Sequence, residues 1–180
     1  MEIAILLLPL LASIISGFFG KYIGDRTSEV LTSLFVSISA GLSLFIFYNV
    51  ILHQYENNVV IASWINSGSL NVNWSIKIDA LSSVMLVVIT LVSALVHIYA
   101  IGYMSHDPHK PRFMAYLSLF TFSMLTLVTS DNFLQLFFGW EGVGLCSYFL
   151  IGFWFKKDTA NAAAIKAFVV NRVGDFGFAL

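Results

Sequence analysis

Glu141 is a carboxylate within an apolar stretch, GWEGVGLCSYFLIGFW, which runs from Gly139 to Trp154. An acidic side chain at the centre of a membrane helix costs about 2.5 to 3.5 kcal/mol on insertion scales, so it usually marks a function. Desolvation favours the neutral carboxyl and a nearby cation favours the charged form, so such a group can take up and release a proton when its partner moves. The sequence therefore indicates proton exchange at Glu141. The alternative is a static buried hydrogen bond or ion pair that fixes helix packing.

The neighbours of Glu141 indicate how a carboxylate is tolerated there. Gly144 and Tyr148 follow by three and seven residues, so they share its helical face and offer room for water and a hydroxyl partner. A stripe of small residues on a neighbouring face consists of Gly139, Gly142 and Cys146. Small residues let another helix approach closely, so Glu141 is expected to face protein and water rather than lipid.

A second group of polar residues occurs near the end of the chain, in AIKAFVVNRVGDFGFAL. Arg172 and Asp175 are spaced i, i+3, and Asn171 reaches Asp175 at i, i+4, so one helical face can carry a pair or a small network. Lys166 lies about one and a half turns before Arg172. These residues either take part in a proton path or form an interfacial ion pair that orients the helix.

The histidines permit fewer conclusions. His97 stands in an apolar run near Tyr99 and could relay protons between the site and the surface, or could be a buried structural histidine. His106, Asp107 and His109 are interrupted by proline, and this spacing fixes no face for metal ligands. We therefore expect a solvated loop there.

Cofactor sites are not predicted. Cys146 is the only cysteine, so the chain offers no disulfide, no zinc site of paired cysteines and no cysteine-ligated iron–sulfur cluster. The glycines of GWEGVG follow no strand, and the DFG at Asp175 to Gly177 lacks the other kinase motifs. We expect no cofactor and no metal in this chain, and any redox chemistry on a partner.

The composition identifies the elements that must position these residues. Hydrophobic residues make up 58% of the chain and charged residues 11%, against about 45 to 50% and about 25% in soluble domains. The formal net charge is −1, and the few cations form no basic patch for a nucleic acid. The chain is therefore expected to be an integral membrane protein, with the lipid bilayer as its surroundings.

Five stretches are long enough to cross a bilayer, which requires about 20 largely apolar residues. They are Ile3 to Lys21, Val30 to Leu52, Asp79 to Tyr103, Arg112 to Thr129 and Asn132 to Phe155. A sixth begins near Asn161 and is cut off at Leu180 without a stop signal, which suggests a fragment of a longer polypeptide. The predicted fold class is all-α, a polytopic transmembrane helix bundle with a small extramembrane β-hairpin.

The hairpin is predicted between the second and third spans. LNVNWSIKI alternates apolar and polar residues, which is typical of a surface strand, and Asn66, Ser67 and Gly68 would form the turn before it. Asp79 can cap the third span. The chain is thus divided into residues 1–78, with two spans and the hairpin, and residues 79–180, which begin an antiporter-like bundle.

The distribution of Lys and Arg predicts the orientation. Basic residues follow the first, third and fifth spans, namely Lys21, Arg26, Lys110, Arg112, Lys156 and Lys157. Lys77 alone follows the second span, and none follows the fourth. The positive-inside rule places the basic connectors in the cytoplasm or matrix, with the N-terminus and the hairpin on the outer side.

The chain also resembles a known family. The run from HIYAIGYMSHDPHKPRF through FFGWEGVGLCSYFLIGFWF, followed by ANAAAIKAFVVNRVGDFGFAL, is similar to the N-terminal part of the antiporter-like subunit of respiratory complex I. That subunit is called chain L in bacterial NADH:quinone oxidoreductase and chain 5 in mitochondria. The resemblance covers essentially the whole chain.

The resemblance implies a proton-translocating membrane-arm subunit built on two inverted helix bundles. It implies that Glu141 pairs with a lysine on a later broken helix, which would lie beyond Leu180, and that Asp175 belongs to the same polar axis. Other membrane-arm subunits would be its partners, and NADH oxidation and quinone reduction would occur elsewhere in the complex, without an NADH site here. Arg172, Asp175 and His97 would shape the water-filled path.

Two alternatives remain at this stage. A subunit of a multi-subunit sodium/proton antiporter would share the fold and the buried glutamate, although the GVGLC run after Glu141 favours complex I. A membrane scaffold without transport would use the same charges for assembly alone.

Overall fold

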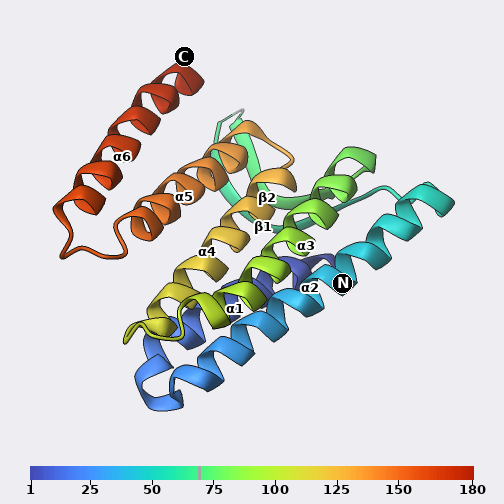
Figure 1. Cartoon of the computed structure of the whole chain (residues 1–180). Helices are drawn as coiled ribbons and strands as arrows, with labels where there is room; N and C mark the ends of the chain where they lie inside the picture. Colours follow the sequence, from blue (N-terminus) through green and yellow to red (C-terminus); the bar gives the residue numbers. More distant parts are fainter. Residues whose placement is uncertain (69) are drawn as a thin grey trace.

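The computed structural model describes residues 1–68 and 70–180, and in these residues it contains helices and one β-hairpin (Figure 1). In chain order the elements are α1 (Glu2–Ile23), α2 (Asp25–His53), β1 (Asn57–Ser67), β2 (Leu70–Ile78), α3 (Ala80–Tyr103), α4 (Lys110–Val128), α5 (Phe133–Ile151) and α6 (Asp158–Ala179). The helices α1 to α5 are long and apolar enough to cross a membrane. The predicted transmembrane bundle with a small hairpin is therefore confirmed.

Three predicted boundaries differ from the structure by three or more residues. Helix α2 begins at Asp25 rather than Val30, because the polar residues DRTSE already form its first turns. Helix α6 begins at Asp158 rather than near Asn161. Helix α5 ends at Ile151 rather than Phe155, because the chain leaves the helix at Gly152 and Phe153 turns inward to become buried.

The helices α1 to α4 pack as a bundle, and α5 and α6 continue from one side of it. Helix α2 packs on α1 and α3, and α4 packs on α1, α3 and α5. Helix α6 lies at the edge of the molecule beside α5 (Figure 1). The main apolar core lies between the helices and the hairpin and is formed by Ile5, Leu6, Ile46, Val50, Ile76, Ile78, Leu86 and Leu125.

The hairpin differs in detail from its prediction. Asn66 and Ser67 pair with Asn71 and Leu70, so they belong to β1 rather than to the turn, and Gly68 follows with a φ of 58°. The antiparallel register shifts twice, between Val60 and Ala62 and between Ser63 and Ile65. These irregularities give β1 11 residues against 9 in β2, which a simple alternation pattern does not reveal.

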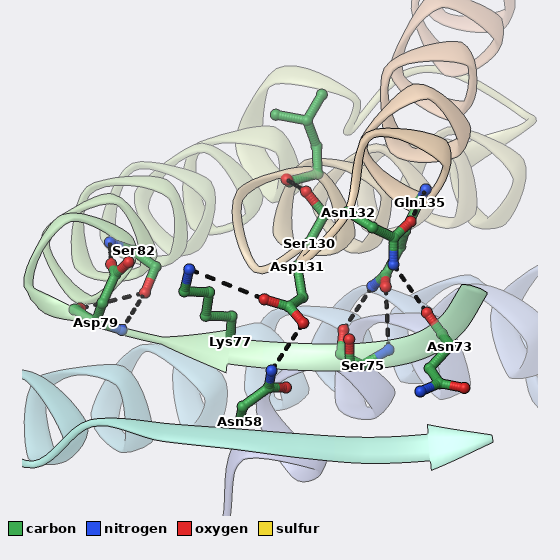
Figure 2. Close-up of polar contacts among 11 residues, drawn as sticks. Asn58, Asn73, Ser75, Lys77, Asp79, Ser82, Ser130, Asp131, Asn132 and Gln135 are labelled. Atoms are coloured by element: carbon green, nitrogen blue, oxygen red, sulfur yellow. Dashed lines mark hydrogen bonds and ion pairs between the residues drawn. The ribbon is translucent and has the colours of Figure 1, made fainter. Parts of the chain in front are cut away.

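The hairpin is fixed to the α4–α5 connection by polar contacts (Figure 2). The Gln135 side chain donates to the Ser75 carbonyl at 2.7 Å and accepts from the Ser75 N–H at 3.0 Å, so it pairs with β2 as a neighbouring strand would. Asn58 donates to Asp131 at 2.7 Å, and the Lys77 ammonium lies 3.8 Å from the same carboxylate. The start of α5 is therefore held in place from outside the bundle.

Candidate functional site

Glu141 is the ninth of the 19 residues of α5, so the helix places it close to mid-span. Helix α5 begins where the Asn132 side chain accepts the Gln135 N–H at 2.9 Å, and it continues through an apolar sequence. The Glu141 carboxylate points toward α6 and accepts a hydrogen bond from the Arg172 guanidinium at 2.5 Å. This short distance makes a charge-assisted pair between two adjacent helices.

Arg172 contacts two carboxylates at once. The guanidinium nitrogen that binds Glu141 lies 3.4 Å from the nearer oxygen of Asp175, at the predicted i, i+3 spacing. The other oxygen of Asp175 accepts from the Trp140 indole N–H at 2.8 Å. Asp175 is 8% exposed and is one of two residues, with Ala164, that the described part of α6 buries. One cation is therefore shared by two acids, and one of these acids has a second donor.

Sequence reasoning missed Trp140. The residue adjoins Glu141, and an indole N–H at membrane depth requires an acceptor, since lipid provides none. This requirement could have identified Trp140 as a residue that binds a polar group near Glu141. Which acceptor it meets depends on how α6 packs on α5, because Trp140 and Asp175 are 35 residues apart.

A cavity of about 240 Å³ adjoins these charges. Its lining residues are Trp140, Glu141, Val143, Gly144, Ser147, Phe168, Asn171, Arg172 and Asp175. Since a water molecule takes about 30 Å³ of the liquid, several could lie beside the Glu141 carboxylate. The charges are thus placed where water can solvate them.

Two predicted contacts, that of Tyr148 with Glu141 and that of Asn171 with Asp175, are absent from the described residues. The Tyr148 ring packs on Phe149 and Phe168 and does not line the Glu141 cavity, because seven residues advance the helix by about 10.5 Å along its axis. Asn171 makes no hydrogen bond to Asp175 within the described residues, since Trp140 and Arg172 occupy that carboxylate. Gly144 does line the cavity as expected.

The stripe of small residues packs against α4. A Cβ on Gly139 would lie 2.7 Å from the Leu127 backbone, and one on Gly142 would lie 2.8 Å from the Ser123 hydroxyl. The Cys146 sulfur lies 3.8 Å from that same hydroxyl. The close helix approach predicted from this stripe is confirmed, and it turns the opposite side of α5, with Glu141, toward α6.

His97 belongs to a different network. It is fully buried in α3, and its ring nitrogens lie 2.8 Å from the Ser93 carbonyl and 3.0 Å from the Ser118 hydroxyl. The Ser93 hydroxyl in turn contacts the Thr121 hydroxyl at 2.5 Å. These residues are not among those that line the Glu141 cavity. The structure thus brings Glu141, Arg172 and Asp175 together. His97 lies away from these three residues.

The connection between α3 and α4 is a loop, as predicted. Asp107 accepts from the His109 N–H at 2.8 Å and from the Trp154 indole at 3.0 Å, so it ties this loop to the α5–α6 connection. Within residues 1–68 and 70–180, no group of three or more His, Cys, Asp and Glu side chains is placed to bind a metal ion.

Two family models match the chain. The one described as "NADH-Ubiquinone oxidoreductase (complex I), chain 5 N-terminus" matches residues 64–114. The one described as "NADH:quinone oxidoreductase/Mrp antiporter, TM" matches residues 130–180. The second match covers all the residues that line the Glu141 cavity.

Individual relatives match over the whole chain. NADH-ubiquinone oxidoreductase chain 5 of Arabidopsis thaliana is 56% identical over 180 residues, which are 100% of this chain and 27% of that protein. NADH-quinone oxidoreductase subunit L of Rickettsia bellii (strain RML369-C) is 52% identical over 178 residues, 99% of this chain and 28% of that protein. The chain therefore spans little more than a quarter of the length of these relatives.

A solved structure shares the fold. It is the membrane-bound sulfane sulfur reductase, an archaeal respiratory membrane complex, in which one chain superimposes with a TM-score of 0.78 and 17% sequence identity. The match covers 97% of this chain and 35% of the other. At this identity the likeness concerns the arrangement of the helices.

Proposed function

Because the chain belongs to the family of complex I chain 5 and subunit L, we propose that it is part of a proton-translocating membrane subunit of NADH:quinone oxidoreductase. One observation carries the proposal: a mid-span carboxylate, Glu141, shares a cation with Asp175 beside a cavity large enough for water. In this proposal the chain works within a multi-subunit enzyme complex, with other membrane-arm subunits as partners. The redox chemistry takes place on those partners.

The proposed chemistry is proton exchange at the Glu141 carboxylate. While Arg172 is paired with Glu141, the charged form of the acid is stabilised; when the pair opens, desolvation favours proton uptake from water in the cavity. Arg172 retains a second acid, Asp175, whose position is set by the Trp140 indole. The guanidinium can therefore leave Glu141 without losing all its partners. The lysine that the family resemblance implies would act from outside these 180 residues.

His97 is a weaker candidate for a proton relay. Hydroxyl groups lie on both sides of its ring, which supports a relay, but they belong to α3 and α4 and not to the Glu141 cavity. A fully buried imidazole with a backbone acceptor equally supports a packing role. We give His97 the packing role, and a test that separates the two is described below.

The orientation is also a proposal. The basic connectors lie at one end of the bundle, which we call the basic face and define by Lys21, Arg26, Lys110, Arg112, Lys156 and Lys157. The hairpin lies at the other end, the hairpin face. The excess of basic residues supports placing the basic face in the matrix or cytoplasm and the N-terminus on the outer side.

The test is a Glu141→Gln substitution in the full-length protein, with Glu141→Asp as the matched control that keeps a carboxylate. In inside-out vesicles, NADH-driven proton uptake is measured together with the NADH oxidation rate and the amount of assembled complex. We expect uptake per NADH to fall in Glu141→Gln at normal assembly, and to be largely retained in Glu141→Asp.

The other outcomes identify the alternatives. Reduced assembly with unchanged uptake per NADH would make Glu141 a packing charge, as in a scaffold subunit. Parent vesicles in which NADH drives no uptake, but a sodium gradient does, would favour a sodium/proton antiporter subunit.

A further inference from the structure

The start of α5 is bonded to the backbone of β2 (Figure 2). The Asn132 side chain, which caps α5, also donates to the Asn73 carbonyl at 2.9 Å. Three residues further on, the Gln135 amide makes its two hydrogen bonds to the backbone of Ser75. Gln135 is fully buried, and a buried amide without partners would cost free energy, so both ends of this side chain are committed to the strand.

Strand β2 is itself held in a fixed place. Ile76 and Ile78 belong to the main apolar core, which also contains residues of α1, α2, α3 and α4. The Lys77 N–H donates to the carbonyl of Thr129, just after the end of α4, at 2.9 Å. A strand that is packed against four helices provides a rigid reference for the fifth.

The rest of this face of α5 provides little to fix the helix along its axis. Gln135 stands at the start of the stripe of small residues, followed by Gly139, Gly142 and Cys146 at spacings of four, three and four residues. Interlocking ridges of side chains fix how two helices pack, and small residues form no such ridges. The stripe therefore sets how closely α5 approaches α4. Gln135 sets where α5 stands along α4, which we call the register of α5.

A contact between aromatic rings restricts the rotation of the same part of α5. The Phe138 ring lies edge to face against Trp74 of β2, with the ring centres 5.0 Å apart, and its centre lies 6.2 Å from that of Trp64 of β1. Gln135 and Phe138 are spaced i, i+3, so the hairpin holds two neighbouring side chains of α5. Rotation of α5 would separate at least one of them from the hairpin.

These contacts lie close to Glu141 along the helix. A helix rises 1.5 Å per residue, so the six residues from Gln135 place Glu141 about 9 Å further along the axis of α5. A slip of one residue at the hairpin would move the carboxylate by about 1.5 Å and turn it by about 100°. Glu141 would then no longer face Arg172.

We propose that Gln135 is a positioning residue for Glu141. Through its hydrogen bonds to Ser75, it transfers the fixed place of the hairpin to α5 and keeps the Glu141 carboxylate at mid-span, directed at its cation. Gln135 acts through the helix and is not among the residues that line the Glu141 cavity. The inference rests on the proposed function, because it concerns where the proton-exchanging group stands.

The test measures the register of α5 separately from pumping. The Cys146 sulfur lies 3.8 Å from the Ser123 hydroxyl of α4, so Ser123→Cys puts a second thiol beside the native one. Copper phenanthroline oxidises the two thiols to a disulfide in the assembled full-length complex. The rate, followed by mass spectrometry of the linked peptides, reports the register. Uptake per NADH is measured in inside-out vesicles in which Ser123 is unchanged.

Gln135→Met keeps the length of the side chain but loses the N–H donor and the carbonyl oxygen. We expect it to slow disulfide formation about tenfold, which corresponds to about 1.4 kcal/mol less free energy holding the register. Uptake per NADH in the assembled complex should fall by a similar factor. Gln135→Glu should restore both, because burial favours the neutral acid, which can accept from the Ser75 N–H and donate to the Ser75 carbonyl.

Ser43→Ala is the matched control, because it removes a buried hydrogen bond, that to Thr90, elsewhere in the bundle. It should leave the disulfide rate and uptake per NADH unchanged. If Gln135→Met yields too little complex, Asn132→Asp takes its place. The carboxylate still caps α5 but cannot donate to the Asn73 carbonyl, so both readouts should change in the same direction by a smaller factor.

Several results would overturn the proposal. A disulfide rate in Gln135→Met equal to that of the parent would mean that α5 keeps its register without the hairpin. Equal losses in Ser43→Ala, or no recovery in Gln135→Glu, would mean that the hydrogen bonds to Ser75 have no special role. A slowed rate with normal uptake, where Glu141→Gln loses uptake, would mean that a working Glu141 tolerates the shift. A slowed rate where Glu141→Gln pumps normally would instead support the positioning of α5 and refute the proposed function.

Discussion

The bundle α1 to α4 and the pair α5–α6 accommodate polar groups at membrane depth in opposite ways. In the bundle the buried polar groups include many hydroxyls and the His97 imidazole, and they bond to one another or to backbone carbonyls, as Ser43 does to Thr90 at 2.6 Å. In the α5–α6 pair they are full charges beside open cavities, with Glu141 and Arg172 in contact. The charges of the bundle lie near the helix ends: Glu29 and Lys110 lie 3.9 Å apart at the basic face, and Glu2 accepts from Asn57 at the hairpin.

This difference separates fixed from movable interactions. A hydroxyl can satisfy itself on its own helix, as Thr90 does on the Leu86 carbonyl at 2.7 Å, so it adds specificity to packing at low cost. An ion pair requires its partner or water, so its geometry responds to a proton. We infer that the bundle is the rigid frame and that the α5–α6 pair is the part whose contacts change during turnover.

The largest effect is expected from Arg172→Met in the full-length protein. The substitution keeps an unbranched side chain but leaves both Glu141 and Asp175 without their shared cation. Breaking a buried pair costs about 3 to 5 kcal/mol, and the 47% exposure of the Arg172 side chain reduces this through screening by water. Uptake per NADH in inside-out vesicles should fall about tenfold, which matches the loss of one charged hydrogen bond.

The control for this variant is Arg172→Lys. It keeps the positive charge but offers no guanidinium plane, so it should retain assembly and part of the uptake. If Arg172→Met pumps as well as the parent, the charge pair is not part of the moving region and the contrast with the bundle fails.

A smaller effect is expected from Gly139→Ala, which probes the boundary between the two regions. The new methyl group would lie 2.7 Å from the Leu127 backbone, which cannot move away as a side chain could. Overpacking of this kind costs about 1 to 3 kcal/mol. We expect less assembled complex on native gels and a lower temperature of half-dissociation, with unchanged uptake per NADH in the complex that remains.

Gly144→Ala is the matched control on the other face of α5. Its methyl group would lie 3.6 Å from the Asn171 amide nitrogen, an ordinary contact. It should assemble normally. Equal losses of assembly in both glycine variants would mean that α6 packs on α5 as tightly as α4 does.

The parts of this arrangement that the sequence predicted are local. The length of the apolar stretches predicted the membrane spans. The spacing of three residues predicted the pairing of Arg172 with Asp175. The stripe of small residues from Gly139 to Cys146 predicted the close packing surface of α5. These features depend only on the geometry of one helix.

The parts that were missed depend on two elements at once. The contact of Glu141 with Arg172 joins residues 31 apart, and its direction is set by which face of α6 meets α5. The turn of the hairpin was misplaced because Asn66 and Ser67 are typical turn residues but pair with Asn71 and Leu70 on the other strand. The periodicity of apolar residues describes one helix or strand at a time. It therefore predicts neither the contact between two helices nor the pairing of two strands.

A third prediction separates packing from relay at His97. His97→Asn keeps an amide N–H that can donate to the Ser93 carbonyl, but it cannot carry a proton, while His97→Leu removes both abilities. If His97 belongs to the rigid frame, His97→Asn should leave uptake per NADH unchanged. His97→Leu should lower the amount of complex by the effect of a lost buried hydrogen bond, about 1 to 3 kcal/mol. Loss of uptake per NADH in fully assembled His97→Asn would instead establish the relay.

The smallest effect is expected at the hairpin face, where Asp79 caps α3 (Figure 2). The Ser82 N–H donates to the Asp79 carboxylate at 2.7 Å, and this hydrogen bond holds the pKa of Asp79 below its ordinary value. Asp79→Ala should therefore lower the stability of the full-length subunit by about 1 kcal/mol at pH 7, the usual effect of a lost cap. The measurement is the temperature at which the purified complex releases the subunit.

The lowered pKa of Asp79 also predicts how the stabilisation by this cap changes with pH. A lowered folded-state pKa means that the stabilisation is fully present above the unfolded-state pKa of about 3.9 and is lost as the pH falls through the lower folded value. The gap in release temperature between parent and Asp79→Ala should therefore be constant near neutral pH and shrink in acid. The Asn side chain of Asp79→Asn can also cap the helix but does not titrate. The difference in release temperature between Asp79→Asn and Asp79→Ala should therefore persist in acid. A gap between parent and Asp79→Ala that persists unchanged in acid would mean that the carboxylate stabilises α3 by its shape and not by its charge, and the hairpin face would then resemble the neutral interior of the bundle.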